Sequence, residues 1–293
     1  VISEIASGKK LSTGKGHSRF IYDIKFSPDS RTLLTGSSDN TAILWDVKTG
    51  KKVQGLSGHT DEVWDVAFSP NGKIAATSGK DDTVKLWDVA SGGEITTLFG
   101  HLDDVRALAF SPDSRRVASG GAQNDNTVRI WNVPKNGPRG TLREHTAAIR
   151  SLSFSNDGRS LASASGDKTA KVWDVETEQD RLSLTGHTEA VNSIVFSPNG
   201  QSLVTGSNDR MVKLCDTLTV KQRLTFDSLA SGTNPVVSPD GKSIATSHFF
   251  NGPDVRIWDA ATGAQRCSFS VGDEKASALY VEFSKNGAQV TAG

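Results

Sequence analysis

Histidine, aspartate and a hydroxyl residue recur together in this chain, and these three residue types can form a triad for nucleophilic catalysis. An aspartate lies six residues before a recurring tryptophan, and in most sets a serine or threonine lies ten before it. The sets are His17, Thr35, Asp39 and Trp45; His59, Thr77, Asp81 and Trp87; His101, Ser119, Asp125 and Trp131; His145, Ser163, Asp167 and Trp173; and His187, Thr205 and Asp209, with Cys215 in the tryptophan position. Ser119 is the nearest counterpart in the third set, which carries a two-residue insertion.

Repetition argues against catalysis at these residues. A catalytic set is needed once, whereas this one recurs along the chain with a tryptophan donor attached. Buried polar groups persist where partners satisfy them, and each neutral hydrogen bond contributes about 0.5–1.5 kcal/mol net. We therefore expect the sets to be structural and to pin the loop between neighbouring units to the strands.

Metal and cofactor chemistry are not indicated. No pair of histidines or cysteines has the spacing of metal ligands, so we predict no metal site. Gly241-Lys242-Ser243 resembles the end of a phosphate-binding loop, but Val236 stands where that loop requires glycine. We read the segment as a turn and expect no cofactor.

The chain is organised as repeats of 42 to 44 residues, the spacing of its tryptophan grid. A turn of the Ser-Pro-Asp/Asn-Gly type occurs seven times, at 27–30, 69–72, 111–114, 155–158, 197–200, 238–241 and 284–287. A fixed internal period overrides the length of 293 residues as a guide to domain number. We predict one domain over 1–293. Because Met211 is the only methionine and Val1 falls within a unit, we expect that domain to belong to a longer protein.

Each repeat predicts a four-stranded antiparallel sheet. Within residues 59–100, runs at 63–68, 74–78, 83–89 and 94–99 are rich in β-branched residues and bounded by turn residues. Proline presets φ at the second turn position, and a later glycine tolerates positive φ. A sheet of this size cannot bury both faces alone, so neighbouring sheets must stack.

These markers resemble the WD40 repeat family. Gly58-His59, the following turn, Asp81 and Trp87-Asp88 match its Gly-His and Trp-Asp pattern, and the resemblance covers essentially all of the chain. The resemblance implies an all-β fold, a seven-bladed β-propeller of four-stranded antiparallel blades around a central channel, used mainly as a rigid platform for protein partners.

The two ends predict how such a ring closes. Val1–Ile5 aligns with the third strand of a unit and Lys9–Ser12 with the fourth. We expect them to pair with strands at Ala278–Phe283 and Ala288–Thr291, so that both termini build the last blade.

Composition narrows the range of partners and compartments. Lys+Arg and Asp+Glu both number 33, and no basic block exists to neutralise phosphates or anionic lipid. We expect neither nucleic acid nor a membrane as partner, and a monomeric propeller. The two cysteines do not indicate a disulfide framework, which favours a cytoplasmic protein. Cys215 should be a buried, poorly reactive replacement for tryptophan, which leaves the fifth blade locally weaker.

A few residues are not explained by the repeat. In the first strand of a unit, Val63, Val66 and Phe68 step by three and then two, which indicates a bulge that turns the residue after Val63 toward the rim. That residue is Trp64, the one tryptophan off the grid. The equivalent position in other units holds Tyr22, Arg106, Arg150, Asn192, Thr233 and Leu279.

Aromatic residues and arginine dominate binding hot spots. We therefore predict a partner-binding arc on the top face that the family resemblance implies, although some of its members could instead pack on neighbouring loops. The arc consists of Phe20, Tyr22, Trp64, Arg106 and Arg150, with Glu62, Lys80 and Asp104 as its polar rim. A second candidate is the Phe249-Phe250 loop of the sixth unit, which either contacts a partner or fills the space left by a missing His–Asp pair.

Three functions fit these features. The leading hypothesis is a non-enzymatic platform that binds a peptide or a domain on the top face. The alternative is a regulatory or sensor domain of a larger signalling protein, which an upstream effector domain in the full gene would indicate. A propeller enzyme comes third, because it would need acidic or metal-ligating residues outside the repeated sets.

Overall fold

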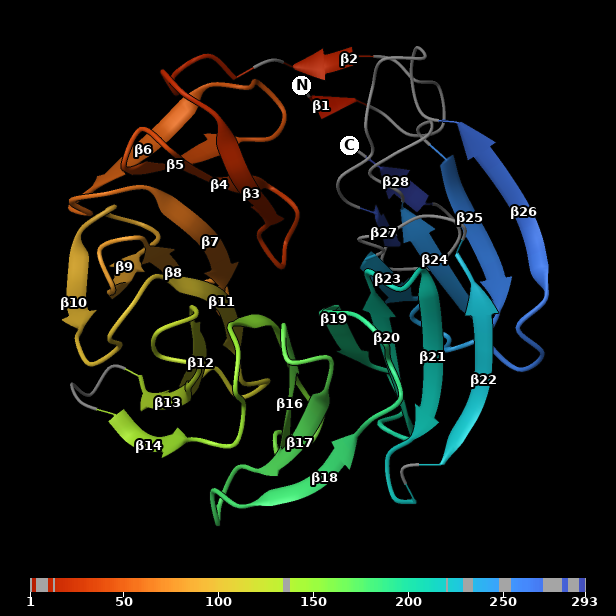
Figure 1. Ribbon diagram of the computed structural model, residues 1–293. Coiled ribbons are helices and arrows are strands. Elements are labelled where there is room, and N and C mark those ends of the chain that lie inside the picture. The colour runs from red at the N-terminus through yellow and green to blue at the C-terminus, as the bar shows by residue number, and fades with distance from the viewer. Residues whose placement is uncertain are drawn as a thin grey trace. The chain divides into compact units, whose positions relative to one another are not determined.

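The computed structural model describes residues 2–3, 10–12, 14–133, 138–219, 221–228, 234–247, 254–270, 281–283 and 290–292. In these residues the regular elements are all β-strands (Figure 1). The chain divides into two compact units, 1–149 and 150–293, and each is described by itself. The prediction of an all-β fold is confirmed, while a single domain stays a prediction.

The first unit contains three four-stranded antiparallel sheets, each with its strands in chain order. The first sheet consists of β3 (Ile21–Phe26), β4 (Thr32–Ser37), β5 (Thr41–Asp46) and β6 (Lys52–Ser57). The second consists of β7 (Val63–Phe68), β8 (Ile74–Gly79), β9 (Val84–Asp88) and β10 (Glu94–Leu98). The third consists of β11 (Val105–Phe110), β12 (Arg116–Gly121), β13 (Val128–Asn132) and β14 (Pro138–Leu142). A two-stranded sheet of β1 (Ile2–Ser3) and β2 (Lys10–Ser12) precedes them.

The second unit repeats this arrangement, with the unit boundary falling at the start of β15. Its first sheet consists of β15 (Ile149–Phe154), β16 (Ser160–Ser165), β17 (Ala170–Asp174) and β18 (Asp180–Leu184). The next consists of β19 (Val191–Phe196), β20 (Ser202–Ser207), β21 (Met211–Asp216) and β22 (Gln222–Asp227). The last four-stranded sheet consists of β23 (Asn234–Val237), β24 (Ser243–Ser247), β25 (Asp254–Asp259) and β26 (Gln265–Ser270). β27 (Val281–Phe283) and β28 (Val290–Ala292) form a two-stranded sheet.

The turn between the first two strands of each sheet is held by its own serine. In the second sheet, Ser69 Oγ donates to Asn71 Oδ1 at 2.8 Å and accepts the Ile74 N–H at 3.0 Å. Gly72 ends the turn with φ at +71°, where a side chain would be strained. The predicted turn chemistry therefore sets the register of the strands that follow.

The predicted bulge is confirmed at the start of the first strand. The register of β7 against β8 shifts between Val63 and Asp65, which leaves Trp64 as the extra residue. Equivalent shifts isolate Tyr22 in β3, Arg106 in β11 and Asn192 in β19. A bulge leaves one residue unpaired and re-aims its side chain.

Core clusters lie between consecutive sheets, apart from the cluster around Trp45, whose described members all belong to the first sheet and its following turn. Leu34, Leu44 and Leu56 of the first sheet pack against Val66 and Trp87 of the second. The same arrangement recurs with Trp131 against the second sheet, Cys215 against the β15–β18 sheet and Trp258 against the β19–β22 sheet. Trp87, Trp131 and Trp258 thus pack against the preceding sheet, and Cys215 is buried as predicted.

The prediction of seven four-stranded blades is confirmed in part, because the described residues form six four-stranded sheets and two end hairpins. The expected end hairpins do form, with Ile2 opposite Ser12 and Val281 opposite Ala292. Among the described residues no strand pairing joins one hairpin to the other. Each end strand has only two or three residues.

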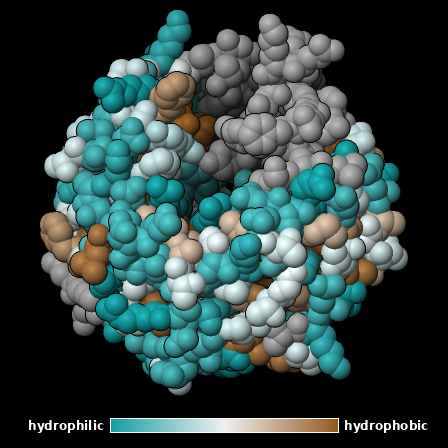
Figure 2. Space-filling view, in the orientation of Figure 1, coloured by the Kyte–Doolittle hydropathy of each residue, from teal (hydrophilic) through white to brown (hydrophobic). Residues whose placement is uncertain are grey.

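No helix in the described part of the chain is long and apolar enough to cross a membrane. Figure 2 shows a face of the molecule that is mostly hydrophilic, with apolar residues in small separate groups. Single apolar residues on a surface are ordinary, whereas apolar side chains that gather together and are rimmed by polar ones mark interaction sites.

Candidate interaction surface

The histidine of each set links a loop to two strands of its sheet. His59 Nδ1 lies 2.9 Å from Asp81 Oδ2, and its Nε2 lies 2.7 Å from Thr77 Oγ1. Trp87 Nε1 donates to the same hydroxyl at 2.9 Å. The carboxylate of Asp81 also accepts the Thr60 N–H at 2.9 Å. A neutral imidazole that donates from Nδ1 and accepts at Nε2 satisfies this whole set.

The electrostatics of the sets fit a neutral imidazole beside a carboxylate. Burial lowers the pKa of His101 and of His187, against the opposing effect of Asp125 and Asp209. Burial alone would raise the pKa of Asp39, but hydrogen bonds from Thr41, the Ser18 N–H and His17 lower it to about 2. The carboxylates therefore stay ionised at neutral pH and keep their acceptor role.

The other sets follow the same geometry with local departures. His17 and His101 bond to Thr35 and Ser119 at 2.7 Å, and Trp45 and Trp131 donate to those hydroxyls. His101 also contacts Asp125. His187 lies 2.8 Å from Asp209 and 2.9 Å from Thr205, with Cys215 in place of the indole. In the fourth set Trp173 donates to Ser163 at 2.8 Å, Asp167 accepts the Thr169 hydroxyl at 2.6 Å, and His145 is buried.

One member of this pattern was missed from the sequence. Trp258 Nε1 donates to Thr246 Oγ1 at 3.0 Å, although the sixth unit has no Gly-His opening. Thr246 lies twelve residues before its tryptophan, the same spacing as between Ser119 and Trp131. That shared spacing was the signal that could have identified it.

These hydroxyl groups are poorly placed for catalysis. Thr77, Ser119 and Ser163 are fully buried, and each hydroxyl already accepts an indole N–H. A nucleophile must reach a substrate carbonyl while its base takes the proton. The arrangement supplies hydrogen bonds between strands and loop and leaves no exposed nucleophile in these sets.

The bulge residues of the first unit form one aromatic stack, defined by Tyr22, Trp64 and Arg106. The Tyr22 and Trp64 rings are stacked, with centroids 4.5 Å apart and planes 17° from parallel. The Arg106 guanidinium carbon lies 5.0 Å from the centroid of the Trp64 ring. Three repeats thus contribute one side chain each to a continuous surface. Tyr22 and Trp64 are half-buried, and each ring packs on the other.

Polar residues border the aromatic stack. The Tyr22 hydroxyl donates to Glu62 Oε2 at 3.1 Å, and the backbone of Glu62 accepts the Lys80 N–H at 2.9 Å. Arg106 forms an ion pair with Asp104 at 3.2 Å. The predicted rim residues Glu62, Lys80 and Asp104 therefore lie beside the stack.

Phe20 is the most exposed large apolar residue of the described chain, at 81 %. Its carbonyl accepts the Ser38 N–H at 2.9 Å, which fixes the backbone two residues before Tyr22. Folding alone does not require an exposed phenylalanine ring at a position where the backbone is held by a hydrogen bond.

Arg150 belongs to the second unit, where it donates to Asn192 Oδ1 at 2.5 Å. Asn192 in turn donates to Asn208 at 2.6 Å. Two residues at positions equivalent to Trp64, Thr233 and Leu279, lie outside the described residues. The Phe249-Phe250 loop also lies outside them.

The repeats match a known family model described as "WD domain, G-beta repeat", at residues 8–46, 50–88, 92–132, 136–174 and 179–216. Together these segments cover well over half of the sequence. The chain belongs to the WD40 family.

Among curated proteins, this WD40 chain is similar to a protein named eukaryotic translation initiation factor 3 subunit I in Aspergillus niger, at 46 % identity over 43 residues. The proteins of that name in Aspergillus oryzae and Neosartorya fischeri match at the same identity over the same length. The matched stretch covers 15 % of this chain and 13 % of each relative. A match of this length is about one WD40 repeat.

Two further features of the WD40 sheets were missed from the sequence. Asp23 Oδ2 accepts the Val66 N–H of the next sheet at 3.2 Å, and Asp65 Oδ2 accepts the Leu108 N–H of the sheet after it at 2.7 Å. Asp23 is buried and Asp65 is half-buried, and Lys25 pairs with Asp23 at 2.7 Å. Burial and the nearby Asp23 charge raise the pKa of Asp65 well above its usual range.

The second feature is a lysine on the third strand that bonds two residues of the fourth strand. Lys85 Nζ bonds Glu94 at 3.2 Å and Thr97 at 2.6 Å across β9 and β10. Lys171 makes the same pair of bonds, to Asp180 at 2.9 Å and Ser183 at 2.8 Å. The lysine two residues before the tryptophan was visible in the sequence, but its partners on the fourth strand require the register.

Within the described residues, the one group arranged to hold a metal ion is Asp82, Asp103 and Asp104, whose ligand oxygens lie within 4.8 Å of one another. Burial and the neighbouring carboxylates raise the pKa of Asp82. Asp104 already pairs with Arg106, and Asp103 accepts the Asn124 N–H at 2.9 Å. Calcium takes six to eight oxygen ligands, so this group is a poor fit for that ion.

Proposed function

We propose that this chain is a non-enzymatic protein-interaction platform, and that its partner docks on the first unit over Phe20 and the aromatic stack. The observation that carries the proposal is the stacking of Tyr22, Trp64 and Arg106, together with an 81 % exposed phenylalanine two residues before Tyr22 in the chain. Three repeats contribute to this surface, and none of these side chains belongs to the repeated hydrogen-bond sets.

The chemistry of the surface favours a protein or peptide partner. Large aromatic rings and arginine contribute most to binding hot spots, and rings already held in place lose little entropy on binding. Glu62, Lys80 and Asp104 would form the polar rim that surrounds such an anchor. Arg150, in the second unit, is proposed as a further contact.

The absence of an enzymatic role is part of the proposal. It is supported by the burial of the hydroxyl groups in the His–Asp–Ser/Thr sets, each of which already accepts an indole N–H in four repeats. We also propose a cytoplasmic, monomeric protein. The relatives that share one repeat are named as a subunit of a translation initiation factor. A function through contacts with other proteins would be common to those relatives and to this chain.

The proposal includes the propeller arrangement typical of WD40 repeats, in which the two end hairpins would complete one further blade within a single domain. Deletion of residues 1–12 would then expose a sheet edge and lower the melting temperature. An unchanged melting temperature of the shortened chain would contradict this part of the proposal.

An affinity capture experiment tests the interaction surface. The tagged chain, the Phe20→Ala variant and the Trp64→Ala variant are used to capture proteins from the source cell, with quantitative mass spectrometry as readout. Phe99→Ala is the matched control, because Phe99 is 72 % exposed in the same unit and is not one of the three residues that define the aromatic stack. We expect at least one protein to be captured by the wild type and by the Phe99→Ala variant. The Phe20→Ala and Trp64→Ala variants should fail to capture it. Equal capture by all four chains would contradict the proposal.

A further inference from the structure

Two neighbouring pockets open between sheets of the second unit. The first, of about 380 Å³, lies between the β15–β18 sheet and the β19–β22 sheet. The second, of about 470 Å³, lies between the β19–β22 sheet and the β23–β26 sheet. Asn199, in the turn after β19, lines both pockets. They are therefore adjacent sites related by one repeat.

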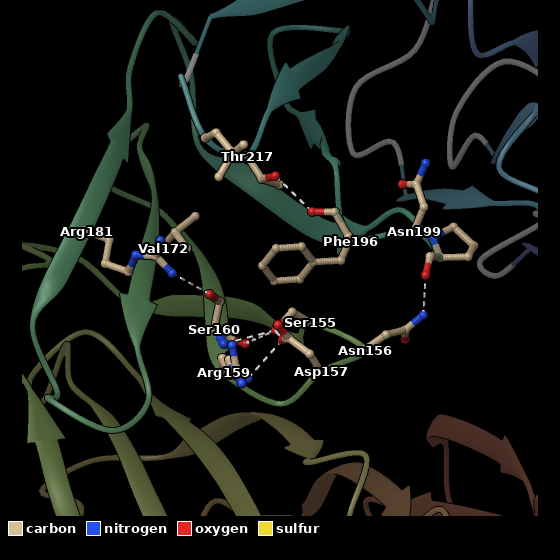
Figure 3. A pocket seen from close by; sticks show the side chains of 13 residues that line it. Ser155, Asn156, Asp157, Arg159, Ser160, Val172, Arg181, Phe196, Asn199 and Thr217 are labelled. Atoms are coloured by element: carbon tan, nitrogen blue, oxygen red, sulfur yellow. Dashed lines mark hydrogen bonds between the residues drawn. The ribbon is translucent and has the colours of Figure 1, made fainter.

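The first pocket combines an apolar floor with a cationic rim (Figure 3). Phe196 and Val172 are buried beneath it, and Figure 3 shows the Phe196 ring pointing into the space beside Val172 and Ser155. Leu218, which is 78 % exposed, lines the same pocket. Arg159 and Arg181 are exposed residues of its lining.

The repeat places an arginine at the same point of each pocket. Arg181 donates to Ser160 at 3.0 Å, Arg223 to Ser202 at 3.3 Å and Arg266 to Ser243 at 2.9 Å. Each arginine stands on the fourth strand of its sheet and reaches the first residue of the second strand. The serine bond holds one guanidinium nitrogen and leaves others for a ligand, since arginine has five N–H donors.

Positive charge exceeds negative charge in the two linings. The cations are Arg159, Arg181, Arg223, Lys242 and Arg266, and the carboxylates are Asp157 and Asp259. Asp259 pairs with Arg266. Asp157 accepts the Ser155 hydroxyl at 2.6 Å and the Arg159 N–H at 3.0 Å, which commits one of its oxygens to the turn.

Two more aspartates lie near these arginines but are occupied by their own turns. Asp174 accepts the Glu176 and Thr177 N–H groups at 3.0 and 2.9 Å. Asp216 accepts the Leu218 and Thr219 N–H groups at 3.0 and 2.8 Å. Their charges weaken the field at Arg181 and Arg223 without blocking the guanidinium groups.

We propose that this pair of pockets binds an acidic segment of a partner protein. Carboxylate side chains of the segment pair with Arg159 and Arg181 in the first pocket and with Arg223 and Lys242 in the second. An aliphatic side chain between them packs on Phe196 and Leu218. Arginine suits this role because its planar fork matches a carboxylate.

The same observations disfavour a nucleic acid at this site. The two linings are small pockets with apolar floors, and backbone recognition of nucleic acid needs a continuous row of cations. The formal charge of the whole chain is zero, so the field that attracts a polyanion over long distances is weak. A peptide can place an acidic and an aliphatic side chain in one pocket.

A peptide titration tests the proposal. The probe is a short labelled peptide with glutamate and leucine in a Gly-Ser background, and its matched control carries glutamine at every glutamate. Binding is followed by fluorescence anisotropy and by the NMR signals of the Asn156 and Asn199 side-chain amides, which line the pockets. Separate arms use inorganic phosphate and a single-stranded oligonucleotide.

The variants are Arg159→Gln and Arg181→Gln, which keep a donor but lose the charge. Arg115→Gln is the control, because Arg115 is an exposed arginine at the position equivalent to Arg159, in the first unit. Thermal melts of all three variants check the fold. Phe20→Ala is included because a defect in the surface of the first unit should leave this binding unchanged.

We expect the glutamate peptide to bind at least about tenfold more tightly than the glutamine peptide, which is the effect of one charge-assisted hydrogen bond. Arg159→Gln and Arg181→Gln should each remove a similar factor, and Arg115→Gln should remove none. Equal binding of the two peptides, or an equal loss in Arg115→Gln, would overturn the proposal. So would an oligonucleotide or phosphate that shifts Asn156 and Asn199 when the peptide does not.

Discussion

The indole of Trp64 stacks on the ring of Tyr22, with 4.5 Å between the centroids, although the two residues come from different repeats. Both occupy the extra position of a β-bulge, which takes their side chains out of the alternating pattern of the strand. Residues that the fold does not need for its core therefore meet and hold one another in place.

The stack predicts an energetic coupling between the two rings. Aromatic pairs contribute about 0.5–1.5 kcal/mol beyond the area they bury. The double variant Tyr22→Ala, Trp64→Ala should therefore lose less stability than the sum of the losses in the two single variants. The measurement is a double-mutant cycle by urea unfolding. Strictly additive losses would show that the rings do not support each other.

The sequence was a good guide to everything that repeats. The period predicted the four-stranded sheets, the serine turn and the bulge at Trp64, because each depends on local residues. The end hairpins formed too, while pairing between the two ends stays a prediction, since it depends on distant segments that a local pattern cannot place. The Tyr22–Trp64 contact depends in the same way on how two sheets pack.

Asp65→Asn is predicted to stabilise the first unit at neutral pH. Burial and the Asp23 charge raise the pKa of Asp65, so its ionisation costs stability as pH rises above the usual carboxyl range. The asparagine oxygen can still accept the Leu108 N–H, and its amide can donate to Asp23. Thermal melts at pH 4 and pH 8 should show a gain for Asp65→Asn at the higher pH only.

Asp23→Asn is the control for that experiment and should destabilise the protein, because it leaves Lys25 without its carboxylate. A loss of stability in both variants at pH 8 would mean that Asp65 is ionised and favourably bound in the native protein.

Acid should unfold the protein in two stages. Burial holds the pKa of His101 and His187 below 6.5, so the unfolded chain binds protons first and stability falls as pH drops below that value. The pKa values of Asp39 and Asp125 lie at about 2, so their contribution is present above 3.8 and is lost between 3.8 and about 2. Urea unfolding of the Asp65→Asn variant from pH 8 to pH 2 measures this, because that variant lacks the opposite pH dependence of Asp65. A stability that rises between pH 6.5 and pH 5 would contradict it.

The two cysteines should react at very different rates. Cys215 is buried against the preceding sheet, and burial raises the pKa of its thiol, whereas Cys267 on β26 is exposed. One thiol per native chain should be labelled rapidly and the second only after unfolding. The Cys267→Ser variant should show no rapid labelling at all. Fast reaction of that variant would mean that the Cys215 site opens readily.

Two structural roles could not be assigned from the sequence alone. Thr246 was not assigned to Trp258 because the sixth unit lacks the Gly-His marker that defined the other sets. Asp65 looked like an ordinary polar residue of a strand, since its burial arises only when two neighbouring sheets cover it. Both assignments needed the packing of sheets in addition to the period.

The most direct test of the proposed interaction surface is a titration of the captured partner against wild type, Trp64→Ala and Phe99→Ala, with thermal melts alongside. Loss of a hot-spot residue should weaken binding by about 2 kcal/mol or more in Trp64→Ala, while Phe99→Ala binds like wild type and all three chains remain folded. Unchanged affinity in a folded Trp64→Ala variant would contradict the account and place the working surface elsewhere on the chain.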